Sequence, residues 1–542
     1  MNRFIENYHK EEFDIIIIGG GITGAAVAYD ASLRGLKVAL LEKDDFGGAT
    51  SAATSKLIHG GLRYLNNFEF SLVRESLRER RYLENIAPNF VYPLPFMIPH
   101  YNGFNSNKWL IKTGLNIYDL LSYDRKWTWD KTKRLPKHQS MSREEALEAE
   151  PNVIAKGLTG ASIYYDCQSI SPERLTLSFI KSALRHGAKV SNHAKVHSFI
   201  YSDEKKIEGV KVIDQLNNKE IEMKGRLTIN CGGPWADIIL NIAEHGESQH
   251  HIKRSEGIHL ITNKLVNQHA VVLMPKDGRH FFLIPWKGHS LIGTTDKEYI
   301  GNPDNYRVTQ HGIEDFIGEI NKSFGNVKLA YNDIKFAYGG LRPIIDDQTE
   351  GTYDSSRKYE IYDNAVDGFE GIITVEGGKY TTSRNLAANT MKIVEKKINR
   401  SIGKSQTEKR YLYGCEIRDI SSFLKTIKTE NNDYNEKTME YLGKDFGTES
   451  KEVLKIARSN REYAEVINED REILAEVVYS VRNEMARTLK DILFRRTSIG
   501  QLGHPGHSVL QRIAKIAAEE LNWDDSKLQK EISDADKALS LP

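Results

Sequence analysis

Residues 19–43 read GGGITGAAVAYDASLRGLKVALLEK, and the architecture of the chain can be worked out from this stretch. It follows an apolar run, DIIII at residues 14–18, which is typical of a strand buried on both faces of a parallel sheet. The alanine-rich residues after the glycines predict a helix that ends at Gly35, and KVALL at residues 37–41 predicts a second strand. The stretch therefore predicts a βαβ unit.

The glycines of this unit have the spacing of a dinucleotide-binding turn. Gly19, Gly21 and Gly24 fit G-x-G-x-x-G, in which the first permits a tight turn, the second admits a pyrophosphate and the third lets helix and strand pack closely. Glu42 stands roughly 20 residues further on, where a carboxylate accepts hydrogen bonds from ribose hydroxyls. Its negative charge would repel the 2′-phosphate of NADP. The pattern predicts NAD or FAD rather than NADP, with a turn that holds no ligand as the alternative.

Two later glycine pairs favour FAD. Gly232 and Gly233 follow a predicted strand at residues 227–230, and Gly377 and Gly378 follow another near residue 375. A nucleotide site assembled from such distant segments suits a long, enclosed ligand better than the contiguous block of a simple NAD domain. Each pair alone is equally well explained as an ordinary turn.

Composition sets wider limits. The chain has 542 residues, 39% of them hydrophobic, and its 75 Lys+Arg against 74 Asp+Glu leave a formal charge of +1. We therefore expect a globular multidomain protein that does not bind nucleic acid. Cys167, Cys231 and Cys415 are too far apart for a disulfide framework or a metal site, and no signal peptide or long apolar run is present, so we expect a cytoplasmic protein without metal.

Strand and helix patterns alternate to about residue 395, which predicts an α/β fold. We expect a Rossmann-like, discontinuous dinucleotide-binding domain at residues 11–75, 165–240 and 336–395. An interleaved α+β substrate or cap domain is expected at 76–164 and 241–335. Residues 396–410 have the composition of a linker, and helical patterns beyond them predict a C-terminal domain over residues 396–542.

Several segments resemble a known family. ATSAATSKLIHGGLRYL at residues 49–65, IPWKGHSLIGTTD at 284–296, GGLRP at 339–343 and GGKYTTSR at 377–384 are similar to signatures of the FAD-dependent glycerol-3-phosphate dehydrogenases, in the D-amino-acid-oxidase-like flavoprotein superfamily. LFRRTSIG at 493–500 resembles their arginine-rich C-terminal segment. The resemblance covers nearly the whole chain. It implies oxidation of sn-glycerol 3-phosphate to dihydroxyacetone phosphate, with electrons passed from FADH2 to a quinone.

Two segments depart from the family pattern. SISPERL at residues 169–175 replaces a more acidic stretch, and QLGHPGH at 501–507 is unlike the family sequence at that place. No substrate role is carried over to either segment.

The resemblance also implies catalytic residues. Oxidising a secondary alcohol needs a base near the O–H, and His259 in SEGIHL matches the proposed base, although a lone histidine is more often structural. Arg63 and Arg342 match the substrate-site arginines and would bind the phosphate, with structural ion pairs as the alternative. Lys379 either polarises the substrate oxygen, stabilises charge on the reduced flavin or lies at the surface.

The glycine turns and the resemblance together predict the cofactor contacts. His59 packs beside the flavin or has a structural role, with neither reading favoured. No His or Cys is placed to form a covalent flavin link, so FAD is expected to bind noncovalently. The expected contacts are Gly19, Gly21, Gly24, Glu42, Thr50, Ser51, Ser55, Lys56, Leu57, His59, Gly232, Gly377, Gly378 and Thr381.

One stretch suggests contact with a membrane. WLIKTGLNIYDLL at residues 109–121 predicts an amphipathic helix, and residues 105–137 hold eight Lys/Arg, three Asp, Trp127 and Trp129. We expect docking on anionic lipid at the inner face of the cell membrane, where a quinone is available. The alternative is a helix that packs its apolar face on the core. The residues assigned to that face are Leu110, Ile111, Gly114, Leu115, Ile117, Tyr118 and Leu121.

Other functions remain open at this point. One is an oxidase that acts on the same substrate and passes electrons to O2, and another is a noncatalytic flavoprotein. The oligomeric state is also open, and a homodimer is one of the alternatives.

Overall fold

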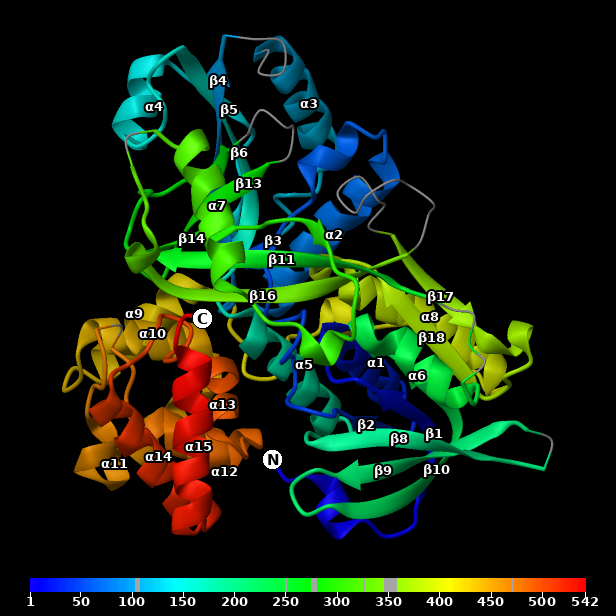
Figure 1. The fold of residues 1–542 in the computed structure, drawn as a ribbon. Coiled ribbons are helices and arrows are strands. Elements are labelled where there is room, and N and C mark those ends of the chain that lie inside the picture. Colours follow the sequence, from blue (N-terminus) through cyan, green and yellow to red (C-terminus); the bar gives the residue numbers. More distant parts are fainter. Residues whose placement is uncertain are drawn as a thin grey trace.

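The computed structural model describes all residues except 103–107, 204, 247, 249, 250, 274–279, 326, 346–357 and 470. Its described residues form two β-sheets with flanking helices and a group of C-terminal helices (Figure 1). The start of the basic stretch predicted at 105–137 lies outside the described residues.

The first sheet contains the predicted dinucleotide-binding unit. Its strands follow the order β17-β18-β10-β1-β2-β7, with β9 beside β10 and β8 beside β9. The five strands from β18 to β7 are parallel, and β1 and β2 lie in register with Ile17 opposite Leu40. The strands are β1 (Glu12–Ile18), β2 (Val38–Leu41), β7 (Lys189–Ser191), β8 (Ala194–Tyr201), β9 (Ile207–Asp214), β10 (Lys219–Asn230), β17 (Tyr359–Asp363) and β18 (Ile372–Gly377).

The helix predicted between the first two strands is confirmed as α1 (Ile22–Leu33). It ends as expected, because Gly35 adopts φ +78°, a conformation that glycine reaches without strain. Helices α5 (Pro172–Arg185) and α8 (Ser383–Lys397) pack beside α1. The carboxyl ends of β1, β2, β10 and β18 meet at one edge, where parallel sheets of this kind bind nucleotides.

The second sheet is built from strands that are widely separated in the sequence. Its order is β15-β11-β14-β13-β12-β4-β6-β3, with β16 beside β11 and β5 beside β6. The strands are β3 (Leu57–Ile58), β4 (Val91–Tyr101), β5 (Gln139–Met141), β6 (Leu158–Ser169), β11 (Lys253–Thr262), β12 (Ala270–Leu273), β13 (Phe281–Trp286), β14 (His289–Gly293), β15 (Lys297–Glu298) and β16 (Ile334–Ile344).

The two faces of this sheet bury different cores. Along β4, Phe96 and Ile98 belong to one cluster and Met97 to the other, as the two-residue period of a strand requires. Helices α4 (Arg143–Ala149) and α7 (Gln310–Ser323) contribute to the cluster that contains Met97. Helices α2 (Phe70–Ile86) and α3 (Lys108–Leu121) contribute to the other.

Sheet membership differs from the predicted division at three places. Strands β3 and β16 and the last residues of β6 belong to the second sheet, although residues 11–75, 165–240 and 336–395 were assigned to the dinucleotide-binding domain. The cause is pairing, since β16 runs along the whole of β11 and β3 pairs with the end of β6. The division into domains itself stays a prediction.

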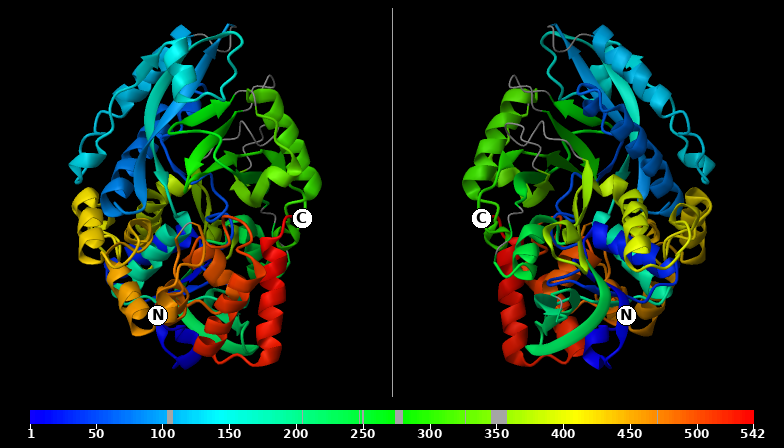
Figure 2. Two further views of the ribbon diagram at one scale, coloured as in Figure 1. Left: turned by 90° about the vertical axis from the view of Figure 1, so that its left-hand side faces the viewer. Right: turned by 90° about the vertical axis from the view of Figure 1, so that its right-hand side faces the viewer.

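The C-terminal region is helical, as predicted. Figure 1 and Figure 2 show these helices (orange and red) grouped at one side of the molecule. They bury their own apolar clusters. They are α9 (Ile420–Glu430), α10 (Glu436–Phe446), α11 (Ser450–Ser459), α12 (Ala475–Glu484), α13 (Leu489–Asp491), α14 (His507–Leu521) and α15 (Asp525–Leu539). The remaining helix, α6 (Ala236–Ala243), is not part of this group and follows β10 of the first sheet.

Helix α3 differs from the predicted amphipathic helix in its orientation. Leu115 and Tyr118, assigned to a lipid-facing side, are buried in the core beneath the second sheet, and the Tyr118 hydroxyl donates to Asp166 at 2.6 Å. Trp109 and Leu110 are instead 74% and 65% exposed. The helix therefore has both a core face and an exposed apolar end. Within the described residues, no helix is long and apolar enough to cross a membrane.

Candidate active site

A cavity of about 1540 Å³ lies between the two sheets. Its lining includes the glycine turns of the first sheet, parts of β11 and β16 from the second, and three residues of the C-terminal region, Phe494, Arg495 and Gln501. The cavity is larger than the roughly 300–1,000 Å³ of ordinary ligand pockets. It therefore has room for a dinucleotide together with a small substrate.

The glycine turn after β1 fits a dinucleotide phosphate. Gly19 has φ +103°, and a Cβ there would lie 2.5 Å from the Cys231 carbonyl oxygen. A Cβ on Gly24 would lie 1.9 Å from the Gly19 carbonyl oxygen. Larger residues are therefore excluded, and the backbone stays open to a ligand at the N-terminus of α1. The Ser51 hydroxyl accepts from the Ile22 N–H at 2.9 Å, which orders this end of the helix.

Glu42 lies at the end of β2, as predicted. Its carboxylate accepts hydrogen bonds from the Gly20 N–H at 2.7 Å and the Asp44 N–H at 2.8 Å. Burial raises the pKa of Glu42 to about 7. The carboxylate lines the cavity next to the glycine turn, where a ribose would be held.

The later glycines reach the same cavity. Gly232 follows β10, and a Cβ there would meet the Ile239 side chain at 2.4 Å. Gly377 and Gly378 have φ +66° and +86° at the end of β18. Thr381, just beyond them, accepts from the His59 N–H at 3.4 Å and so joins two of the predicted segments. The segments expected to build one nucleotide site are therefore brought together.

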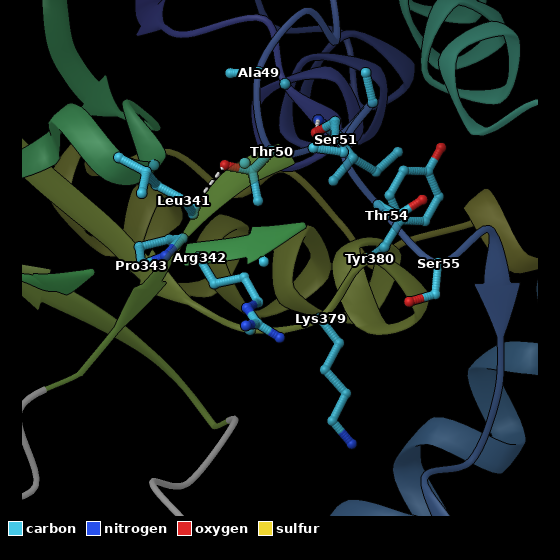
Figure 3. A pocket seen from close by; sticks show the side chains of 18 of the residues that line it. Ala49, Thr50, Ser51, Thr54, Ser55, Leu341, Arg342, Pro343, Lys379 and Tyr380 are labelled. Atoms are coloured by element: carbon cyan, nitrogen blue, oxygen red, sulfur yellow. Dashed lines mark hydrogen bonds between the residues drawn. The ribbon is translucent and has the colours of Figure 1, made fainter. Parts of the chain in front are cut away.

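The loop between β2 and β3 lines the cavity along most of its length. Thr50 donates to the Leu341 carbonyl at 2.6 Å, a contact drawn in Figure 3. Leu57 starts β3 and also lines the cavity. Lys56 lines it too, but its buried ammonium lies 2.8 Å from Glu173, so its charge already has a protein partner.

His259, the predicted base, lies on β11 inside the cavity lining. Its Nε2 is 2.9 Å from the Ser55 hydroxyl, and its ring stacks on Tyr338 with centroids 4.9 Å apart. Its Nδ1 is buried without a hydrogen-bonding partner among the described residues. Burial, reinforced by Arg342 and Lys56, lowers the pKa of His259 to about 3. The imidazole is therefore neutral at neutral pH, and one ring nitrogen keeps a lone pair.

Arg342, on β16, is held in one orientation. Its Nη2 donates to the Ser255 hydroxyl at 2.8 Å, the Glu256 carbonyl at 3.0 Å and the Thr295 carbonyl at 2.9 Å. It also lies 3.3 Å from the Asp296 carboxylate. This support fixes the plane of the guanidinium where it lines the cavity. Figure 3 shows Arg342 and Lys379 extending into the same space, with Ser55 facing it from another side.

Lys379 and Arg63 share a neighbour. The Lys379 ammonium lies 3.9 Å from the centroid of the Tyr64 ring and donates to the Ser76 hydroxyl at 3.1 Å. The Arg63 guanidinium is 5.0 Å from the same ring centroid. Burial lowers the pKa of Lys379. Both cations and the Tyr64 ring line the cavity, which makes this part of it attractive to an anion.

The structure adds cavity residues that the sequence-based list lacks. Tyr64 follows Arg63 in the GGLRYL segment, so its place in that segment could have identified it. His280 precedes β13 and had no recognisable signal. Burial, together with Arg63 and His59, lowers the pKa of His280 to about 4, and burial beside Lys379 and Arg63 lowers that of His59 to about 3. Both rings are neutral at neutral pH.

The segment 501–507, set aside in the sequence, contributes to a surface group. Among the described residues, His504, His507 and Asp536 are close enough to share a cation. His504 Nδ1, however, accepts from the Gly506 N–H at 2.8 Å, so its Nε2 carries the proton and donates to the Asp536 carboxylate at 2.9 Å. The three residues do not line the cavity.

Comparisons with known proteins agree with this fold and show the family. A family model described as "FAD dependent oxidoreductase" matches residues 14–384, and one described as "C-terminal domain of alpha-glycerophosphate oxidase" matches residues 405–528. The class of protein is thus that of the FAD-dependent oxidoreductases. A glycerol-3-phosphate dehydrogenase of Synechocystis sp. is 34% identical, with 96% of this chain and 95% of that protein covered. The chain belongs to the family of FAD-dependent glycerol-3-phosphate dehydrogenases.

Two further relatives extend the likeness. An aerobic glycerol-3-phosphate dehydrogenase of Staphylococcus saprophyticus is 32% identical over 90% of this chain and 87% of that protein. The structure of the glycerol-3-phosphate dehydrogenase from Bacillus halodurans complexed with FAD superposes with a TM-score of 0.79 at 26% identity. That match covers 99% of this chain and 96% of the other. The similarity therefore includes the C-terminal helices.

Proposed function

We propose that this protein oxidises sn-glycerol 3-phosphate to dihydroxyacetone phosphate, transfers the hydride to FAD and passes the electrons to a quinone. The observation that carries the proposal is the presence of a neutral, buried His259 in one cavity with the cations Arg63, Arg342 and Lys379. The names of the relatives support the same substrate. The cations suit a phosphate dianion, and the imidazole suits the removal of a hydroxyl proton.

The residues divide the reaction between them. Oxidation of a secondary alcohol releases a hydride from the carbon and a proton from the oxygen, and FAD supplies the hydride acceptor when bound. His259, oriented by Ser55 and Tyr338, takes the proton. Arg342, with its guanidinium plane fixed by Ser255, binds phosphate oxygens in pairs.

Lys379 and Arg63 stabilise the remaining negative charge. Both lie beside Tyr64, so substrate oxygens in this part of the cavity meet two cations at once. A partly desolvated ammonium interacts more strongly with a developing oxyanion than an exposed one. The lowered pKa of Lys379 reflects that desolvation.

An anaerobic absorption spectrum tests the proposal. Glycerol 3-phosphate should bleach the flavin bands of the purified holoprotein, and glycerol, which lacks the phosphate, should not. Arg342→Met should weaken substrate capture at least tenfold, because each charge-assisted hydrogen bond contributes roughly 1.5–3 kcal/mol. Arg254→Met is the matched control, since Arg254 lies on β11 opposite Pro343 of β16 but pairs with Asp237 outside the cavity lining. Flavin that stays oxidised with glycerol 3-phosphate would refute the proposal.

An oxidase is the second candidate, because the C-terminal match is described by the name of an oxidase. The two enzymes differ only in what reoxidises the reduced flavin. After anaerobic bleaching, addition of a quinone should restore the flavin spectrum much faster than air does. Rapid recovery in air with one peroxide per turnover would favour the oxidase instead.

A quinone acceptor requires access from a membrane, and α3 supports that access. Its residues Leu110, Ile111, Gly114 and Ile117 line the cavity, as does the exposed Phe68. Around them, Leu120, Tyr123 and Trp127 are 61–72% exposed, and Lys108, Lys112, Lys126 and Lys131 are also exposed. We propose that the exposed side of α3, together with the exposed residues that follow it, docks peripherally on an anionic bilayer, so that an apolar acceptor enters the cavity beside Phe68.

A further inference from the structure

The loop of residues 42–56, here named the cofactor loop, has no helix or strand of its own. It lines the cavity from Glu42 to Lys56 with few interruptions, on the path between the nucleotide end and His259. The loop has a few backbone hydrogen bonds of its own, such as that from the Gly48 N–H to the Asp45 carbonyl at 3.0 Å, and side-chain contacts from outside hold it further. The C-terminal region supplies such contacts at both ends of the loop.

The first contact is a buried ion pair at Asp45. Arg496 donates two parallel hydrogen bonds to the Asp45 carboxylate, at 2.6 and 2.7 Å, and both side chains are almost completely buried. Arg495 adds a third hydrogen bond at 3.0 Å, and the Asn192 amide a fourth at 2.9 Å. A bidentate arginine–carboxylate pair fixes orientation as well as distance. The start of the cofactor loop is therefore held by residues more than 400 positions further along the chain.

The second contact is at Lys56. Its ammonium pairs with Glu173 and lies 3.4 Å from the Gln501 amide oxygen. Gln501 in turn donates to the Phe494 carbonyl at 2.8 Å, and the Phe494 ring stacks on Phe336 of β16. Residues 492–501 thus form one compact segment, which reaches both ends of the loop and lines the cavity itself.

We infer that residues 492–501 are a positioning element, which holds the cofactor loop in its FAD-binding conformation and so retains the cofactor. The FAD-dependent oxidoreductase family model ends at residue 384, so this element is additional to the flavin-binding fold. A loop already fixed in its bound shape loses less conformational entropy when the ligand binds. It also opens less often, so the ligand leaves more slowly.

The competing explanation is that the C-terminal helices only stabilise the protein. A second buried ion pair between the same parts of the chain separates the two explanations. Lys181, on α5, pairs with Glu484 of α12 at 3.0 Å and with Glu449. Among the described residues, the Lys181 ammonium contacts neither the cofactor loop nor the cavity lining. Its partner Glu484 touches the positioning element only through its backbone carbonyl, which accepts from the Arg496 Nε–H at 2.9 Å and is unchanged in Lys181→Met.

Lys181→Met leaves Glu484 paired with Arg174, and Arg496→Met leaves Asp45 paired with Arg495. Each change therefore removes one cation from a buried cluster of charges, and both should destabilise the fold.

The test measures FAD release from the holoprotein. Arg496→Met, Asp45→Asn and Lys181→Met are purified with FAD, diluted, and followed by the rise in flavin fluorescence, and the thermal midpoint of each variant is recorded. FAD should leave at least tenfold faster from Arg496→Met and Asp45→Asn than from Lys181→Met at a similar thermal midpoint. In FAD-saturated samples the KM for glycerol 3-phosphate should stay close to that of the unchanged protein.

The inference is overturned if all three variants release FAD at rates that follow their thermal midpoints alone. If Arg496→Met does not fold, Asp45→Asn decides, because it keeps the shape of the side chain while it removes the charge and replaces one accepting oxygen with a donor. Arg496→Lys adds a further discrimination. Lysine restores the positive charge but lacks the planar guanidinium that forms two parallel hydrogen bonds. If the segment positions the loop, FAD should still leave Arg496→Lys quickly; if it only neutralises the charge of Asp45, the slow FAD release of the unchanged protein should return. The readout needs only bound FAD and is independent of the proposed substrate.

Discussion

Glu42 determines how the nucleotide end of the cavity responds to pH. Its pKa of about 7 means that half of the carboxylates are protonated near neutrality. The raised pKa stabilises the fold at low pH, and that contribution disappears as the pH rises through 7. Ribose hydroxyls donate to the ionised carboxylate, so ligand binding and folding favour opposite protonation states of this group.

We therefore expect FAD affinity to increase as the pH rises. Between pH 6 and 8 the ionised fraction of a group with a pKa of 7 rises from about a tenth to nine tenths, so the dissociation constant should fall by roughly tenfold. Glu42→Gln should bind FAD with little pH dependence. Fluorescence titration of the cofactor-stripped protein at several pH values measures both. An equally steep pH dependence in the Gln variant would show that another group is responsible.

Individual residues differ in how far the sequence could predict them. Gly19 and Gly24 were predictable because a Cβ at either place would collide with neighbouring backbone. Lys56 was expected at the cofactor, yet Glu173 holds its charge, and no local pattern links positions 117 residues apart. His280 reaches the cavity only because β13 pairs with β12 and β14. Contacts that depend on strand pairing leave no mark in a short stretch of sequence.

The sequence left open whether the apolar residues of α3 face a membrane or pack on the core. In the structure some of them are buried in the core and others are exposed. Apolar periodicity identified the helix, but not which of its apolar residues meet the core. Leu115 and Tyr118 do so, whereas Trp109 and Leu120 remain exposed. Two of the basic residues near α3 are also unavailable to lipid, because Arg125 and Lys133 are buried against backbone carbonyls.

A triple variant of exposed residues tests membrane docking. Replacing Trp109, Leu120 and Trp127 with Ser should reduce binding to anionic vesicles at least tenfold and slow reduction of a long-chain quinone in them. Activity with a water-soluble dye should be unchanged. The matched control is Ile300→Ser with Val366→Ser, which removes apolar side chains that are 91% and 79% exposed elsewhere on the surface. Equal vesicle binding by both variants would exclude docking through α3.

Strand β4 shows a second limit of sequence patterns. Proline is rare inside paired strands, yet β4 contains three prolines and is continuous over 11 residues. Proline is tolerated where a strand lacks a partner on one side. Strand β12 pairs with β4 at Phe96 and Met97, so Pro93 and Pro95 lie beyond that pairing and have β6 as their partner strand. The long-range pairing of β4 therefore had to be observed.

FAD binding should connect the two sheets. The glycine turns and Glu42 belong to the first sheet, whereas His259 and Arg342 belong to the second. A ligand that extends between them stabilises the folded molecule by about 2.7 kcal/mol at a hundredfold excess over its dissociation constant. FMN, which lacks the adenosine half, would leave the Glu42 end of the cavity without a partner.

We expect FAD to raise the thermal midpoint of cofactor-stripped protein by several degrees, and FMN at equal concentration to raise it much less. Differential scanning fluorimetry measures the shift, with riboflavin as a further comparison. The flavin should also be released by acid precipitation, in keeping with noncovalent binding. Equal shifts with FAD and FMN would contradict a nucleotide site at the Gly19 turn, and colour retained in the pellet would indicate a covalent link.

The order in which the first sheet is assembled has a consequence for biosynthesis. Strand β1 leaves the ribosome almost at once, but its neighbour β10 follows about 200 residues later and β18 more than 350 residues later. The Asp45–Arg496 pair forms only when the last tenth of the chain has emerged. Because such distant pairings close slowly, the nascent chain exposes the apolar faces of β1 and β2 for most of its synthesis. A ribosome that stops before residue 492 would therefore release a protein unable to keep its flavin, and quality-control proteases would meet it with that sheet still incompletely secured.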